Sequence, residues 1–112
     1  MHIRFILLCF MLLLGGCQTT KSLYYWGHYE SSIKAIQLGK DVSIDKQISE
    51  LEEDIQKSRN EDLRIAPGVM AHLGYLYTLQ GENKGAISAF NIEKKMFPES
   101  TAFMNRMIKK AK

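Results

Sequence analysis

The chain has 112 residues and carries 15 lysines and arginines against 12 aspartates and glutamates, a formal net charge of +3. This length suits one small domain. A charge so close to balance lacks the concentrated basic surface that nucleic-acid binding requires, so no nucleic-acid partner is expected. Both cysteines, Cys9 and Cys17, fall within the first 17 residues. The rest of the chain therefore has no thiol for a disulfide, thiolate catalysis or a cysteine metal site.

The first residues predict a secretory signal segment. A short start containing Arg4 precedes an unbroken apolar run from Phe5 to Leu14. The run is shorter than the roughly 20 apolar residues that span a bilayer, but it suits a signal segment. It ends in Leu14-Gly15-Gly16-Cys17, which resembles the lipobox of bacterial lipoproteins. Residues 1–16 are thus interpreted as a signal peptide, with a plain signal peptide and an incidental cysteine as the alternative.

The lipobox resemblance implies that the protein is lipidated and located at the outer membrane. By this resemblance Cys17 carries a covalent lipid, diacylglycerol on its sulfur and a further acyl chain on its amine. More than one chain anchors stably, since each buried methylene contributes about 0.8 kcal/mol. Gln18 in place of Asp points toward the outer membrane, with the domain expected in the periplasm. Residues 17–22 form a short tether, and from Cys17 to Tyr24 the chain reaches at most roughly 23 Å.

The most aromatic stretch of the chain is Leu23–Glu30, and Ser31–Leu38 follows it up to Gly39. Gly27 stands five residues before Ser32, as Gly81 stands five before Ala86. The stretch is therefore predicted to be the second helix of an incomplete N-terminal repeat. Packing against the next helix is the favoured role of its aromatic side chains. An exposed binding cluster or a membrane-interface belt remains the alternative.

An amphipathic helix is predicted from Ser43 to Arg59. Its apolar positions are spaced four, three and four residues apart, which is one face of a helix; they are Ile44, Ile48, Leu51 and Ile55. Its acidic residues are expected on the outside as a solvated face rather than as a metal or acid–base site; they include Glu50, Glu52, Glu53 and Asp54. Residues 60–66 are predicted to form a loop.

The strongest pattern in the chain lies between Pro67 and Pro98. Its spacing is that of a tetratricopeptide (TPR) helix-turn-helix repeat, in the positions Met70, Leu73, Gly74, Tyr77, Ala86, Phe90 and Pro98. Pro67 suits a first helical position, and Gly81 suits a left-handed cap between the helices. An unrelated helical hairpin with the same spacing is the alternative.

Small residues within this hairpin predict a close helix contact. Gly74 and Ala86 are expected where the two backbones approach, and Tyr77 and Phe90 are expected to fill the space around them. A glycine inside a helix costs about 1 kcal/mol relative to alanine, which packing would offset.

A last helix is predicted after Pro98, with an apolar face formed by Phe103, Met104, Met107 and Ile108. Repeat arrays commonly end in a helix that covers the last repeat. Residues 23–112 are therefore predicted to form an all-α domain of TPR-like helical hairpins, about one and a half repeats plus a C-terminal capping helix.

Three stretches together resemble a known family of small bacterial lipoproteins. They are KSLYYWGHYE at 21–30, RIAPG at 64–68 continuing to HLGYLY at 72–77, and FPES at 97–100. The combination is similar to the family called domain of unknown function 4810 (DUF4810). The resemblance implies no catalytic residues. It does imply neighbours in the cell envelope, because members tend to be encoded beside a lipoprotein similar to the curli secretion pore and another small lipoprotein.

No residue pattern in the chain predicts catalysis. His72 has no second histidine or carboxylate at the spacing of a helical zinc site, and Gly81–Gly85 is better explained as an interhelix turn than as a phosphate loop. The protein is therefore expected not to be an enzyme and to hold no metal or cofactor beyond the lipid on Cys17.

The function expected from these features is a non-enzymatic interaction or assembly module in an envelope complex, with other envelope lipoproteins or membrane-adjacent proteins as partners. In TPR repeats the first helix lines the concave face, which by position assigns Ala71, Tyr75 and Thr78 to partner binding. Tyr75 is the leading contact, since aromatic residues supply much of the energy at such surfaces. The alternative is a self-associating structural lipoprotein that uses the aromatic residues Tyr24, Tyr25, Trp26 and Tyr29.

Overall fold

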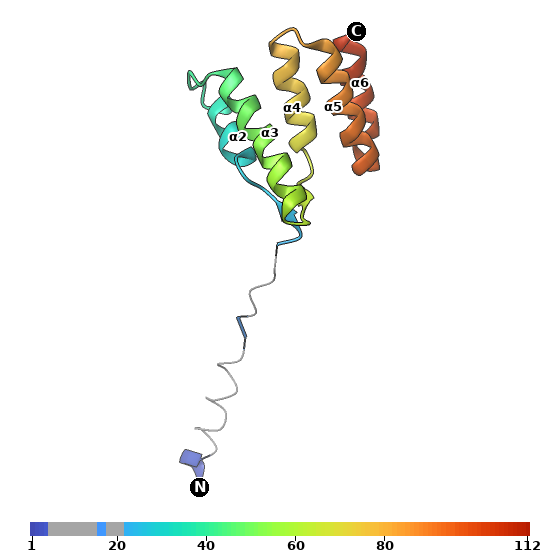
Figure 1. Cartoon of the computed structure of the whole chain (residues 1–112). Helices are drawn as coiled ribbons and strands as arrows, with labels where there is room; N and C mark the ends of the chain where they lie inside the picture. The colour runs from blue at the N-terminus through green and yellow to red at the C-terminus, as the bar shows by residue number, and fades with distance from the viewer. Residues whose placement is uncertain (5–15, 18–21) are drawn as a thin grey trace.

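A computed structural model describes residues 1–4, 16–17 and 22–112 of the chain. The predicted apolar run of the signal peptide and tether residues 18–21 lie outside the described residues. The elements in order are β1 (Tyr24–Tyr25), α2 (Tyr29–Gln37), α3 (Ile44–Asn60), β2 (Arg64–Ile65), α4 (Val69–Leu79), α5 (Asn83–Met96), the 3-10 turn η1 (Pro98–Ser100) and α6 (Thr101–Ala111). The helices stand side by side in sequence order (Figure 1), which confirms the all-α prediction. No helix within the described ranges is both long and apolar enough to cross a membrane.

Helix α3 forms where its periodicity predicts it. The Ser43 hydroxyl accepts the Lys46 N–H at 3.4 Å and so caps the first turn. Ile48, Leu51 and Ile55 are buried as predicted. The prediction that the acidic residues lie outside is wrong for Asp54, which is buried. Its carboxylate is satisfied by another segment of the chain, a contact that helical periodicity does not reveal.

Asp54 holds the start of α2 against α3. One carboxylate oxygen accepts the His28 backbone N–H at 2.6 Å, and the other lies 3.0 Å from His28 Nδ1. Gly27 makes this approach possible: its φ is +45°, and a Cβ there would lie 2.3 Å from the Asp54 carboxyl group. Asp54 therefore serves as a cap that α3 supplies to α2.

The turn between α4 and α5 lies where it was predicted. Gly81, just beyond the end of α4, has a left-handed φ of +79°. Pro67 is not the first residue of α4. The helix begins at Val69, because the left-handed φ of +95° at Gly68 is incompatible with a helical residue.

Gly74 is needed for close packing within the hairpin. A Cβ on Gly74 would lie 2.5 Å from the Phe90 ring, so the glycine leaves room for the ring that was predicted to pack around it. Phe90 is fully buried, as expected, in a cluster with Ala86, Met104 and Ala111. The core between α5 and α6 is thus built around one aromatic ring.

A short parallel ladder replaces the loop predicted for residues 60–66. Tyr24 pairs with Arg64, and Tyr25 pairs with Ile65. Tyr24 and Tyr25 are therefore fixed to the segment between α3 and α4. In Figure 1 this ladder lies at the end of the domain where α3 finishes and α4 begins.

The first helix of the domain is α2, the stretch predicted as the second helix of an incomplete N-terminal repeat. Strand β1 precedes it, and α2 lines one groove together with α4, α5 and α6. Another groove, lined by Ile55 of α3 and by Ile92 and Met96 of α5, also involves Met70 of α4. Helix α2 therefore borders the same groove as α4.

Candidate functional site

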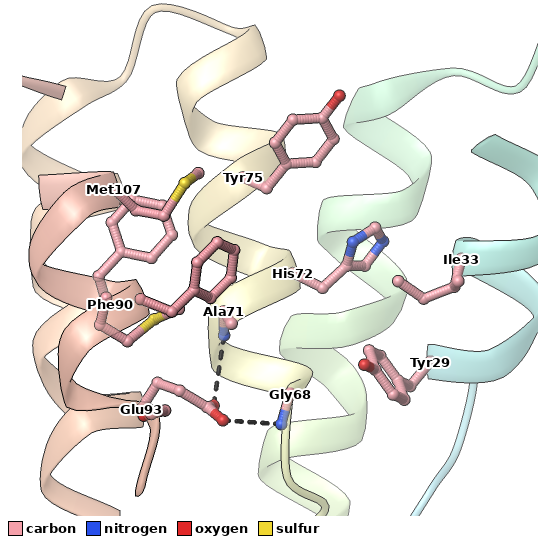
Figure 2. A pocket seen from close by; sticks show the side chains of 12 residues that line it. Tyr29, Ile33, Gly68, Ala71, His72, Tyr75, Phe90, Glu93 and Met107 are labelled. Atoms are coloured by element: carbon pink, nitrogen blue, oxygen red, sulfur yellow. Dashed lines mark hydrogen bonds between the residues drawn. The ribbon is translucent and has the colours of Figure 1, made fainter. Parts of the chain in front are cut away.

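A groove of about 340 Å³ has α4 in its middle, between α2 and α6 (Figure 2). We call it the α4 groove. Its lining comprises Tyr29, Ile33, Gly68, Ala71, His72, Tyr75, Phe90, Glu93, Ser100, Phe103, Met104 and Met107. The volume falls within the range of ordinary ligand and side-chain pockets.

The middle of the groove is formed by α4, which presents Ala71, His72 and Tyr75 on one face. The Tyr75 side chain is 36% exposed, and its ring stacks on His72 with centroids 6.3 Å apart. The structure therefore places Tyr75 and Ala71 together in the lining. Thr78 is not in the lining. It is half-buried, and its hydroxyl donates to the Gly74 carbonyl oxygen at 3.0 Å.

His72 links three helices below the groove surface. Its Nε2 lies 2.8 Å from the Ser32 hydroxyl of α2, which in turn donates to Gln47 Oε1 of α3 at 2.5 Å. Because the only hydroxyl proton goes to Gln47, the second hydrogen bond requires His72 Nε2 to carry a proton and donate. Burial lowers the pKa of His72, which keeps the ring neutral at pH 7. A histidine that donates to a serine is not its general base, so this arrangement fits a structural network.

The floor of the groove contains a carboxylate that the sequence patterns did not single out. Glu93 of α5 accepts the Gly68 N–H at 2.7 Å through one oxygen and the Ala71 N–H at 3.3 Å through the other (Figure 2). Gly68 has no side chain to cap α4, and Glu93 satisfies these N–H groups instead. Burial is the largest cause that raises the pKa of Glu93, against the lowering effect of the backbone hydrogen bonds. Its partners are 22 and 25 residues away, so no local spacing could have indicated it.

Aromatic rings connect the N-terminal strand to the groove. From one end they are Phe97, Tyr24, Trp26, Tyr29, His72 and Tyr75, with successive centroids 5.9–6.3 Å apart. We call this set the aromatic row. Tyr24 and Tyr25 are half-buried in β1, whereas Trp26 is 42% exposed. The two groups of aromatic residues predicted as separate candidate sites are thus partly joined in one structure, and Tyr24 packs against the core.

The α6 side of the groove is apolar and open. Met104 is buried, Met107 is half-buried, and Phe103 is 52% exposed. The sequence predicted these residues as the packing face of a capping helix, and only part of that face is covered. The feature that the sequence analysis missed is the contribution of α2, since Tyr29 and Ile33 complete the opposite wall.

The remaining predicted site is Cys17, which is exposed with a free thiol. Within residues 1–4, 16–17 and 22–112, no three histidine, cysteine, aspartate or glutamate side chains are grouped as metal ligands.

Comparison with known proteins gives one match. The family model described as "Domain of unknown function (DUF4810)" matches residues 23–107, which run from just before β1 into α6. Neither the curated proteins nor the solved structures contain a match to this chain.

Proposed function

Since the chain belongs to the DUF4810 family, as its sequence predicts, we propose from its geometry that it is a non-enzymatic interaction or assembly module in a cell-envelope complex. The observation that supports this most is the α4 groove, an open apolar concavity with an exposed tyrosine at its centre. Exposed aromatic residues beside apolar pockets are the usual anchors of protein interfaces.

The proposed architecture is a TPR-like array. Two observations support it: the hairpin α4–α5 carries the repeat spacing, and α2, α4 and α6 border the same groove. In such arrays the first helix of each pair lines the concave surface, which is where the partner binds. Ala71 and Tyr75 occupy that surface, and Thr78 stabilises the helix behind it.

The proposed location is the outer membrane, with the domain in the periplasm and Cys17 carrying the lipid anchor. The lipobox spacing supports lipidation, and Cys17 is exposed. Ser22, the first described residue after the tether, directly precedes the β1 end of the domain. The ladder end is therefore proposed to lie nearest the membrane. The proposed partners, other envelope lipoproteins, would meet the domain close to that surface.

The experiment that tests the interaction module is photocrosslinking in intact cells. A photoreactive amino acid is placed at Tyr75 in the groove and, in separate strains, at Trp26 and at Ile92. Ile92 is the matched control, because it is 40% exposed but lines the groove between α3 and α5. Mass spectrometry then identifies the adducts.

Capture of another envelope protein at position 75 and not at position 92 is the expected result. Capture of this chain alone would support the alternative, a self-associating structural lipoprotein. The absence of any adduct at position 75, or equal capture at position 92, would contradict a partner site in the groove.

A further inference from the structure

We propose that the α4 groove receives a peptide segment in which apolar side chains are flanked by carboxylates, contributed by a different protein. This inference rests on the proposed function and specifies the chemistry of the partner. It follows from two properties of the groove, namely its satisfied polar groups and the charge of its α6 rim.

Three polar side chains of the lining, Glu93, His72 and Ser100, are already engaged inside the domain. Glu93 accepts two backbone N–H groups, His72 is bonded to Ser32, and the Ser100 hydroxyl donates to the Phe97 carbonyl oxygen. No buried side-chain nitrogen or oxygen among the described residues lacks a hydrogen-bond partner. Apart from the hydroxyls of Tyr29 and Tyr75, the lining offers few side chains for new hydrogen bonds. The groove interior therefore favours apolar groups, since burying a polar group without a hydrogen bond is costly. Methionines in the lining allow it to adapt to the shape of that occupant.

The part of the chain that forms the α6 wall is strongly basic. Residues 83–112 contain seven lysines and arginines but only two acidic residues, Glu93 and Glu99, and Glu93 is buried. In the described structure, every ion pair involves α3: Lys46 with Glu50, Lys57 with Glu53, and His28 with Asp54. The positive charge of α5 and α6 is thus available to an external partner.

One of these cations, Arg106, stacks on a residue of the groove lining. The Arg106 guanidinium lies 5.6 Å from the centre of the Phe103 ring, and Phe103 forms part of the lining. A carboxylate next to an apolar side chain inserted in the groove would therefore approach Arg106. Charge-assisted hydrogen bonds to guanidinium are among the stronger polar contacts, and complementary rim charges mainly accelerate association and select partners.

A second copy of the chain is a poorer occupant. Its acidic segment, residues 41–62, has eight acidic residues against three basic ones, so its charge is suitable. However, the apolar residues Ile48, Leu51 and Ile55 of α3 are buried in the core. The outer face of α3 thus offers carboxylates without an apolar side chain to insert.

The test selects peptides from a random twelve-residue display library on the lipidated protein held in lipid nanodiscs, with empty nanodiscs for subtraction. Enriched peptides are then measured by fluorescence polarisation against the wild type, Tyr75→Ala, Arg106→Glu and Lys95→Glu. Lys95→Glu is the matched control. It reverses one positive charge at an exposed position of α5 and, unlike Arg106, Lys95 stacks on no ring among the described residues.

The expected peptides place Asp or Glu beside Leu, Met, Phe or Trp. Their affinity should fall about tenfold in Arg106→Glu, as expected for loss and reversal of one close charge contact. It should also fall in Tyr75→Ala and stay within about twofold in Lys95→Glu. Enrichment without acidic bias, binding that survives Tyr75→Ala, or no enrichment would each overturn the proposal.

Other occupants give distinct results in the same system. Binding of a dansyl-labelled undecanoic acid that is lost in Tyr75→Ala, without any peptide enrichment, would assign the groove to acyl chains. Concentration-dependent pairing of nanodiscs that is lost in Arg106→Glu would assign it to a second copy. Either result overturns this inference. A protein partner captured at position 75 with equal yield in wild type and Arg106→Glu would overturn the acidic preference alone and leave the proposed function in place.

Discussion

At the scale of a single residue, Tyr75 allows the proposed partner binding to be tested separately from the stability of the fold. Its ring stacks on His72 but faces solvent, so removing it should leave the core intact. Tyr75→Ala is expected to weaken partner capture while the melting temperature changes little, because exposed substitutions usually alter stability by less than about 0.5 kcal/mol. Crosslinking yield and circular dichroism melting check this. Leu79→Ala, 48% exposed on the same helix but outside the groove lining, is the control. A fall of many degrees in Tyr75→Ala would show that Tyr75 belongs to the core.

Phe90 and Gly74 form a size-matched pair. Phe90→Ala should lower the free energy of unfolding by about 3–5 kcal/mol, the usual cost of emptying a buried aromatic site. Gly74→Ala should also destabilise, because its Cβ would lie 2.5 Å from the Phe90 ring. Gly85→Ala is the matched control, since its Cβ would make ordinary contact with Tyr77 at 3.4 Å and alanine is favoured in helices by about 1 kcal/mol. Urea denaturation measures all three. If Gly74→Ala is as stable as Gly85→Ala, the predicted contact is wrong.

Glu93 is expected to make the free energy of unfolding fall as the pH rises. Burial raises its pKa in the folded state above the ordinary 4.5, so the folded state binds this proton more tightly than the unfolded state. Its contribution to stability is therefore fully present below pH 4.5, and is lost as pH rises through the folded pKa. The free energy of unfolding of the wild type, relative to Glu93→Gln, should decline over that window and then level off. Urea denaturation of both proteins from pH 4 to pH 8 measures the difference. A difference that rises with pH would contradict the direction of the shift.

At the scale of elements, α2 depends on one contact for its first turn. Asp54→Ala removes the acceptor for the His28 N–H and imidazole, and should cost about 1.5–3 kcal/mol, the range for hydrogen bonds to charged groups. Hydrogen exchange should rise across 28–37, while α4 and α5 remain protected. Glu53→Ala, one residue away and exposed, should leave the exchange of α2 unchanged. If hydrogen exchange in Asp54→Ala increased equally across all helices, α2 would not unfold separately from the rest of the domain.

Local sequence patterns predicted the elements that depend on neighbouring residues. Helix α3, the turn at Gly81 and the buried Phe90 follow from periodicity, glycine conformation and side-chain size. The features that were missed all connect distant residues. Asp54 bonds a residue 26 positions away, and Glu93 bonds two residues more than 20 positions away. The β1–β2 ladder pairs residues 40 positions apart. The groove could not be predicted for the same reason, because its α2 wall depends on where α2 packs against residues distant in the sequence.

At the scale of the whole molecule, the acidic segment, the basic segment and the proposed anchor occupy different parts of the chain. The acidic segment lies in and around α3, the basic segment in α5 and α6, and the proposed anchor precedes both. This separation leaves the basic wall of the groove free of internal ion pairs among the described residues. A partner recognised there should bind more weakly as salt is raised, because exposed charges are screened.

The anchor can be tested without affecting the domain. Cys17→Ser should abolish palmitate labelling and release the protein from the membrane fraction, because no sulfur remains to accept diacylglycerol. Cys9→Ser, within the predicted signal peptide, should behave as wild type in both assays. Radiolabelling and fractionation of the envelope measure the outcome. Persistent labelling of Cys17→Ser would contradict the lipobox assignment.

The ladder between β1 and β2 also determines how the domain responds to mechanical force. A pull on the proposed anchor at Cys17 would reach β1 before the helices. That strand is held by the Tyr24–Arg64 and Tyr25–Ile65 pairs and by the packing of Tyr24 against Phe97. Helix α2, held at its start by Asp54, is next in the path. Segments with few stabilising contacts open first, so α4, α5 and α6 should keep their fold while the anchored end extends. With the proposed anchor and partner site, tension would increase the distance between membrane and partner, and the loss of α2 would remove one wall of the groove.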